Sequence, residues 1–467
     1  MTKLFVVLAA LCSAPVGMSG EVRMTSENGI VEIGMMNEPL DIEDLMRVSF
    51  IASGTEPEKI DEYIQEMENI LSLVPSATGD AAADGETLLE WMHDGYLRRY
   101  VEAQTRLDVL LENGTYNCVS SAVFYLILAR SMGLPVLGVL TTDHAFCRIP
   151  TADGGIDVET TTPYGFDPGT RREAVDSFTG RTGFTYVPPG NYSRRKDIGE
   201  KELISLIYQN RISALQKSGR WGDTVGLARD RWELAGTDSA ETDFRTSITN
   251  YAAEMDRLRR QEDGLVFLNR AARSLGEAHG LESTAAALLG NAVTYHLRAG
   301  RIDEAITLLN DEELTTLVPR VFVEERRREA AVRELENKVK REPFEGAVEA
   351  VDEALRNGNI DNRRWEELTL YLWSTEARRL SQGGKWLDGW RFLGESPERT
   401  QRIVRWNELR ETYRHNAVVS FHNDFISAMM RNQYDQARRI LDDVAEIFPD
   451  NPTLEQDRRA LESRTGG

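Results

Sequence analysis

Cys118 and His144 are the residues whose types and spacing are best suited to covalent chemistry in this sequence. Cys118 opens the apolar run CVSSAVFYLILARS, which has helical spacing and ends before Gly133-Leu134-Pro135. We therefore expect Cys118 at a helix N-terminus, where unpaired amides and the helix dipole favour thiolate over thiol. A thiolate is a strong nucleophile, so the chemistry indicated here is attack on an electrophilic carbon with help from a base.

We expect a group of strands to place His144, the candidate base, beside the cysteine. The runs VLGVL, residues 136–140, and HAFCRI, residues 144–149, have strand composition and are separated by a turn. After a second turn at 153–155, the run IDVETT adds a strand that carries Asp157 and Glu159. Both acids lie on one strand face, and a carboxylate beside His144 would fix the tautomer of its imidazole. The pattern predicts a Cys-His-acid triad with either acid as third member.

The order of helix-borne cysteine, strand-borne histidine and acid resembles the transglutaminase-like branch of the papain-like thiol enzymes, over roughly residues 90–170. The resemblance implies an α+β fold, in which a helix carries the cysteine and antiparallel strands carry the histidine and the acid. It implies Cys118 as nucleophile, His144 as general base, and Glu159 in preference to Asp157 as the acid, because Val158-Glu159-Thr160-Thr161 matches the family's aspartate stretch. Glutamate in place of aspartate is a departure from that pattern.

Other residues near this pair could have supporting roles. The Cys118 backbone N–H is a candidate oxyanion donor, whereas Gln104 is too remote in sequence to assign. Cys147 lies on the strand face opposite His144 and is expected to pack, with a bridge to Cys118 as the alternative. His415 and His422 could share a helix face, but no third ligand is evident, so we expect no metal and no cofactor.

From residue 201 onward the sequence predicts paired amphipathic helices. A turn signature of glycine or asparagine, a bulky residue and an acid recurs at intervals of about 41 residues or twice that. This resembles tetratricopeptide hairpins, most clearly in residues 291–310 and 423–452, although their period is shorter. An all-α solenoid of hairpins is therefore expected, with a surface for a protein partner. The bulky residues are Trp221, Ile302, Phe344, Trp386 and Tyr434.

The composition and the N-terminus restrict the expected partners and the expected location of the protein. The formal net charge of -21 would repel nucleic acid and anionic lipid, so neither is an expected partner. Residues 1–20 have the lysine, apolar core and small residues of a signal peptide, which predicts export to a periplasm or to the outside. No later run is long enough to span a membrane. Lipid attachment at Cys12 is the less favoured alternative, because Leu11 is bulky.

These observations predict a signal peptide at 1–20, a thiol domain at 21–200 and a helical repeat array at 201–467. The function that follows is an exported thiol enzyme that hydrolyses or transfers acyl groups at peptide or protein amides, with repeats that bind protein. The alternative is a catalytically inactive peptide-binding or scaffold protein that acts through its repeats.

Overall fold

The computed structural model describes residues 22–27, 29–152, 154–276 and 280–466, which form two compact units divided between Leu288 and Leu289. The predicted signal peptide, with Cys12, lies outside the described residues. The expected domain boundary after residue 200 stays a prediction.

The first unit contains a four-stranded antiparallel sheet, with strand order β5-β4-β3-β6. The three expected strand runs form three of its members, and a segment near residue 197 adds the fourth at the edge beside β3. A separate parallel pair, β1 and β2, runs into the start of the helix that carries Cys118. The strands are β1 (Arg99–Tyr100), β2 (Thr115–Tyr116), β3 (Leu137–Leu140), β4 (Ala145–Ile149), β5 (Ile156–Val158) and β6 (Lys196–Ile198).

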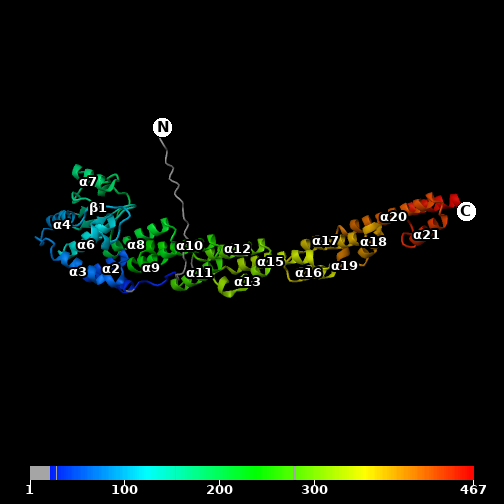
Figure 1. Cartoon of the computed structure of the whole chain (residues 1–467), viewed down its shortest axis with the longest axis horizontal. Helices are drawn as coiled ribbons and strands as arrows, with labels where there is room; N and C mark the ends of the chain where they lie inside the picture. The colour runs from blue at the N-terminus through cyan, green and yellow to red at the C-terminus, as the bar shows by residue number, and fades with distance from the viewer. Residues whose placement is uncertain (1–21, 28, 153, 277–279, 467) are drawn as a thin grey trace, which may run out of the picture. The chain divides into compact units, whose positions relative to one another are not determined.

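Helix α6 is the centre of the first unit. Its residues from Val119 to Ala129 are all buried, as expected for a helix that is apolar on every side. It packs against β4 and against α2, α4, α5 and α8, and Figure 1 shows α2, α4 and α6 gathered beside the strands. Helices of this unit are α1 (Ile30–Met35), α2 (Ile42–Ser53), α3 (Ile60–Leu71), α4 (Ala81–Gly95), α5 (Leu107–Asn113), α6 (Cys118–Ser131), α7 (Arg172–Thr182), α8 (Glu200–Lys217), α9 (Trp221–Ala235), α10 (Asp238–Arg257) and α11 (Gln261–Leu275).

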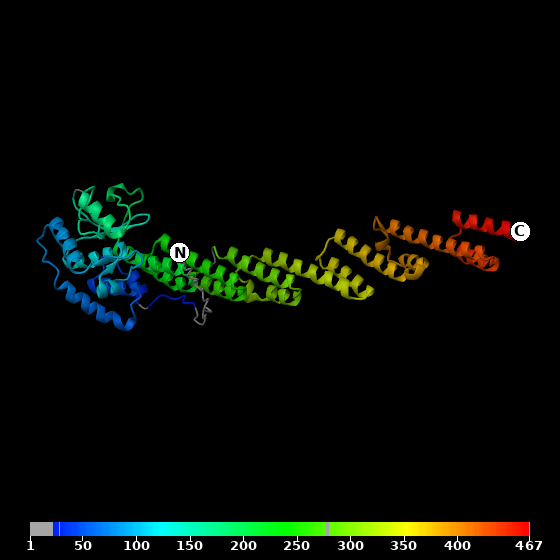
Figure 2. The same cartoon turned by 45° about the horizontal axis from the view of Figure 1, so that its top comes forward.

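The expected fold class, an α+β transglutaminase-like or papain-like domain followed by an all-α solenoid, is wrong. Helix accounts for 69% of the described residues and strand for only 5%. The strand runs were recognised, but each is three to five residues long in the sheet. Helices pack closely against the sheet, since α8 contacts both the central helix α6 and strand β3. The helices α9 to α11 that follow α8 belong to the same compact unit. The green helices α8 to α11 lie side by side in both views (Figure 2).

The second unit is built from helices that pack against their neighbours in the chain. Trp386 packs on both of its apolar clusters, one around Trp406 and one around Phe425. None of the described helices of the chain is long and apolar enough to cross a membrane. Helix α12 (Glu282–Arg298) spans the division between the units, and the second unit holds α13 (Ile302–Asn310), α14 (Glu312–Thr315), α15 (Arg320–Arg341), α16 (Phe344–Arg356), α17 (Asn362–Leu380), α18 (Trp386–Gly394), α19 (Glu398–Gln401), α20 (Trp406–Met430), α21 (Tyr434–Ala445) and α22 (Pro452–Thr465).

The recurring turn signature has a common backbone basis. Each of its five bulky residues is the first residue of a helix, at the starts of α9, α13, α16, α18 and α21. Before four of these helices the chain takes a left-handed conformation, at Gly219, Gly300, Gly384 and Asn432. Glycine and asparagine adopt this conformation at low energetic cost, which explains why they recur where one helix ends and the next begins.

Candidate active site

Cys118 is the first residue of α6 because Asn117 caps this helix. The Asn117 side-chain oxygen accepts hydrogen bonds of 3.0 Å from the amides of Val119 and Ser120, and the Ser120 hydroxyl accepts one of 2.9 Å from the Asn117 amide. This reciprocal capping box fixes where the helix starts. Among the described residues no acceptor contacts the Cys118 amide, so its N–H is available to an incoming group.

His144 directly precedes β4 and connects the sulfur to a carboxylate. Its amide donates a 3.1 Å hydrogen bond to Thr141 Oγ1, and its carbonyl accepts one of 2.9 Å from the Thr141 amide, which closes the turn between β3 and β4. The Nε2 atom lies 2.6 Å from Glu159 Oε2. The ring also hydrogen-bonds with the Cys118 side chain, and Nδ1 is the ring nitrogen left for that contact.

The charges around His144 favour its protonated form. Burial alone would lower the pKa of the ring, but the Glu159 carboxylate and the hydrogen bonds with Cys118 and Glu159 outweigh it, and the pKa lies well above its usual value. A buried cation is stable only beside a compensating negative charge. The site is therefore arranged to hold an imidazolium between a carboxylate and a sulfur.

Glu159 is held rigidly at the end of β5. The residue is 2% exposed. Oε1 accepts hydrogen bonds from the amide and the hydroxyl of Thr161, at 3.1 and 2.7 Å, which leaves Oε2 for His144. The Glu159 amide donates a 2.8 Å hydrogen bond to the Gly165 carbonyl, so a tight loop returns against the strand end. The carboxylate thus has little freedom to turn away from the imidazole.

Asp157, the competing acid, lies outside this arrangement. It pairs with Arg148 in the register between β5 and β4, further from His144 than the end of the strand. Its carboxylate receives two hydrogen bonds from the Arg195 guanidinium, at 2.8 and 2.6 Å. The structure therefore brings Cys118, His144 and Glu159 together and engages Asp157 elsewhere.

A second layer of side chains, which sequence reasoning missed, holds the loop after Glu159. His93 Nε2 donates a 3.1 Å hydrogen bond to the Thr160 carbonyl, and Tyr116 donates one of 3.1 Å to the Thr161 carbonyl. Burial, and then the nearby Arg181 charge, lower the pKa of His93 to about 3, so its ring is neutral near pH 7. The one sequence signal that could have identified His93 was its position on the apolar face of an amphipathic helix. Buried histidines at such positions are common, so this signal does not indicate a role in a site.

Aromatic rings enclose the imidazole. Phe178, on α7, meets the His144 ring edge-on at 5.8 Å between ring centroids. Tyr192 stacks at 6.3 Å, and Phe146 lies at 6.1 Å. These rings lower the local dielectric, which strengthens the electrostatic interactions of His144 with its charged neighbours.

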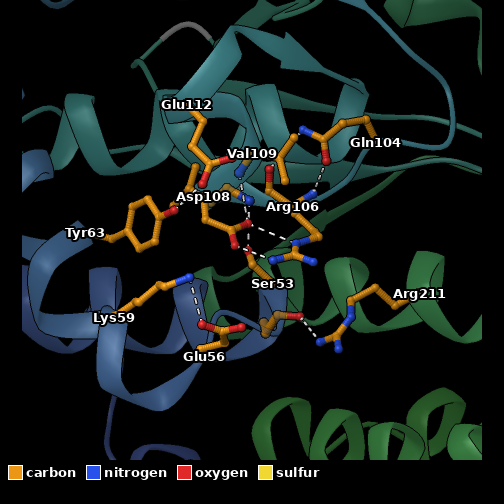
Figure 3. A network of polar contacts seen from close by, with 12 residues as sticks. Ser53, Glu56, Lys59, Tyr63, Gln104, Arg106, Asp108, Val109, Glu112 and Arg211 are labelled. Carbon is orange, nitrogen blue, oxygen red and sulfur yellow. Dashed lines mark hydrogen bonds and ion pairs between the residues drawn. The ribbon is translucent and has the colours of Figure 1, made fainter.

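Gln104 belongs to the loop beside Cys118 but turns its amide toward backbone. Its Nε2 donates to the Thr115 carbonyl at 2.6 Å. Its Oε1 accepts from the Arg106 amide at 2.6 Å (Figure 3). Arg106 in turn makes two hydrogen bonds to the Asp108 carboxylate, at 3.0 and 2.5 Å. Gln104 therefore fixes this loop, and the Cys118 amide is the oxyanion donor that the geometry leaves available.

The remaining candidates lie apart from this site. Cys147 is buried and donates from its sulfur to the Ala122 carbonyl at 3.4 Å, and burial raises the pKa of its thiol. Cys118 and Cys147 are both free thiols. His422 lies 2.9 Å from the Asp457 carboxylate, and His415 is exposed.

Comparison with known proteins gives no family. No family model and no curated protein matches the chain. Among solved structures the chain is similar to menin, whose crystal structure is described as revealing its binding site for Mixed Lineage Leukemia protein. That similarity has 12% identity and a TM-score of 0.34, over 84% of this chain and 96% of menin. At this TM-score it carries no argument about fold or function.

The loop behind Glu159 requires glycine at position 165. A Cβ there would lie 1.9 Å from the Glu159 carbonyl oxygen, so Gly165→Ala must displace the backbone that positions the carboxylate. We expect this variant to lose about 2 kcal/mol or more of unfolding free energy and to react more slowly at Cys118. The matched control is Gly180→Ala within α7, where nothing lies within 4 Å of the added carbon. Denaturant melts and thiol labelling of both variants check this, and equal behaviour of the two would contradict it.

The depressed pKa of His93 predicts a specific acid sensitivity. The ring titrates near 6.5 when unfolded and at about 3 when folded, so its contribution to stability is complete above pH 6.5 and is lost as the pH falls toward 3. Relative to His93→Gln, whose amide can donate to the same carbonyl without titrating, wild type should lose about 1.4 kcal/mol per pH unit over that window. Denaturant melts between pH 7 and pH 4 measure the difference, and a pH-independent difference would refute the assignment.

Proposed function

We propose that this protein is a thiol enzyme that hydrolyses or transfers acyl groups at peptide or protein amides. The observation that carries the proposal is the continuous series of contacts from Cys118 through His144 to Glu159. A carboxylate that orients an imidazole, which in turn contacts a sulfur at a helix start, is the arrangement that nucleophilic thiol catalysis requires. The resemblance of the motif order to transglutaminase-like thiol enzymes supports the same chemistry.

The reaction proceeds through a thioester. The Cys118 sulfur attacks the carbonyl carbon of the amide, and the developing oxyanion accepts a hydrogen bond from the Cys118 amide. The His144 imidazolium gives its proton to the leaving nitrogen as the C–N bond breaks, which leaves a thioester on Cys118 and a neutral imidazole. Neutral His144 then takes a proton from water or an acceptor amine, which attacks the thioester and regenerates the thiolate. Glu159 keeps the ring oriented and stabilises its charged form.

We favour hydrolysis over cross-linking, because the sequence contains no calcium-binding loop and no recognisable acyl-acceptor pocket. We further propose that the protein is exported under the direction of residues 1–20, and acts in a periplasm or outside the cell. Its net charge of -21 argues against nucleic acid as a partner.

The helices of the second unit are proposed to bind a protein partner. A groove of about 850 Å³ lies between α17 and α20, lined in part by Leu370, Tyr371 and Val404. Tyr371 is 54% exposed and Val404 is 87% exposed, which is unusual for such large apolar side chains when they lie close together. This groove is also what favours the alternative function, a scaffold whose triad-like site has no catalytic role.

Thiol labelling separates the two functions. If the site is catalytic, iodoacetamide should alkylate Cys118 rapidly near pH 6, where an ordinary thiol reacts slowly, and peptide mapping by mass should locate the adduct. His144→Ala should slow the labelling at least about tenfold, and Glu159→Gln should slow it less.

Two internal controls accompany this measurement. Asp157→Asn alters the neighbouring acid, and it should leave the rate within about twofold of wild type, because this carboxylate contacts Arg195 and not His144. Buried Cys147 should remain unlabelled in the native protein. Slow labelling of wild type with no response to His144→Ala would favour the scaffold.

A further inference from the structure

Arg181 is an arginine near the candidate site with which no carboxylate pairs in the described part of the chain. It lies in the last turn of α7 and is exposed. Its one hydrogen bond goes to the Tyr116 hydroxyl, a neutral group, at a long 3.4 Å. By contrast, Arg195 pairs with Asp157 and Arg172 pairs with Asp176.

Helix α7 directs this cation toward the reacting groups. Phe178 and Arg181 are three residues apart and therefore share a helix face. Phe178 contacts the His144 ring at 5.8 Å, and Arg181 contacts Tyr116 one turn further along. Tyr116 also donates to the Thr161 carbonyl, on the loop that holds Glu159. The guanidinium thus contacts an aromatic side chain that itself contacts the loop after Glu159.

The nearest triad carboxylate does not neutralise Arg181. Both oxygens of Glu159 are already engaged, one by His144 and the other by Thr161. Strand β1, which packs against α7, begins with the exposed Arg99, and the exposed Arg98 directly precedes it. Neither forms an ion pair with any residue that the structure describes. Three exposed arginines without an ion pair to a described residue therefore lie on or next to α7 and β1, in a chain whose net charge is -21.

We propose that Arg181 binds a carboxylate of the substrate, so that the preferred substrate of Cys118 is an acidic peptide. This inference rests on the proposed function. A carboxylate placed against a guanidinium beside the cleft would replace water with a charge-assisted hydrogen bond and would orient the amide over the sulfur. The carboxylate could belong to an acidic side chain or to a peptide C-terminus.

The charge preference can be measured without knowing the natural substrate. Iodoacetate and iodoacetamide both alkylate a thiolate, with the sulfur–carbon bond forming as iodide leaves, but only iodoacetate carries a carboxylate. Arg181→Ala should lower the iodoacetate-to-iodoacetamide rate ratio at Cys118 about two- to fivefold at low salt, and added salt should lower the wild-type ratio toward that of the variant. Arg172→Ala, on the same helix, should leave the ratio unchanged.

Three chloroacetyl dipeptides distinguish the sources of the carboxylate: one with glutamate and an amidated C-terminus, one with glutamine and a free C-terminus, and one with glutamine and an amidated C-terminus. Faster capture of either acidic probe than of the neutral one, lost in Arg181→Ala, supports the proposal and identifies the source. Arg181→Gln serves if the alanine variant does not fold. Rapid iodoacetamide labelling with a ratio that Arg181 does not affect overturns this inference alone, whereas slow labelling of wild-type Cys118 overturns the proposed function.

Discussion

The contact between the His144 imidazole and the Glu159 carboxylate is the interaction on which the rest of the site depends. A charged carboxylate at 2% exposure is costly to bury, and three donors compensate it: the amide and hydroxyl of Thr161, and His144 Nε2. Because Glu159 is fixed by its own loop, the imidazole is fixed by Glu159, and the other ring nitrogen is presented to the Cys118 sulfur. Removing the carboxylate would take away the counter-charge of the buried imidazolium, so the ring would lose its proton, a larger change than the loss of one hydrogen bond.

The surrounding helices act mainly by placing these three groups. The Asn117 capping box sets the first residue of α6, the turn closed by Thr141 sets the start of β4, and Gly165 permits the loop that ends β5. Each of these is a short-range constraint encoded by one or two residues. The burial of α6 then brings them together, because a helix that is apolar on all sides is stable only when other elements surround it.

Sequence reasoning predicted the local features of the site well and the distant ones poorly. The cysteine at a helix start and the histidine at a strand start follow from capping and strand patterns that occupy a few residues. The helix begins at Cys118 as expected, and β4 begins one residue after His144. The partner of Asp157 could not be predicted, since Arg195 lies 38 residues away, and neither could the role of His93, which lies 67 residues from Thr160. The predicted α+β fold class was wrong for a related reason. The strand runs were recognised from local patterns, but how much helix surrounds the sheet depends on segments far away in the sequence.

The protonation state of His144 tests the central claim most directly. Nitrogen NMR of histidine-labelled protein, with the His144 signals assigned by comparison with His144→Ala, reports whether one or both ring nitrogens carry a proton. The arrangement of Glu159, His144 and Cys118 predicts a doubly protonated ring at pH 7 and above, because the carboxylate and the sulfur contact raise the pKa of the ring well above its usual value. The same experiment on Glu159→Gln should show a neutral ring at pH 7. A neutral His144 ring at pH 7 in the wild-type protein would contradict the account.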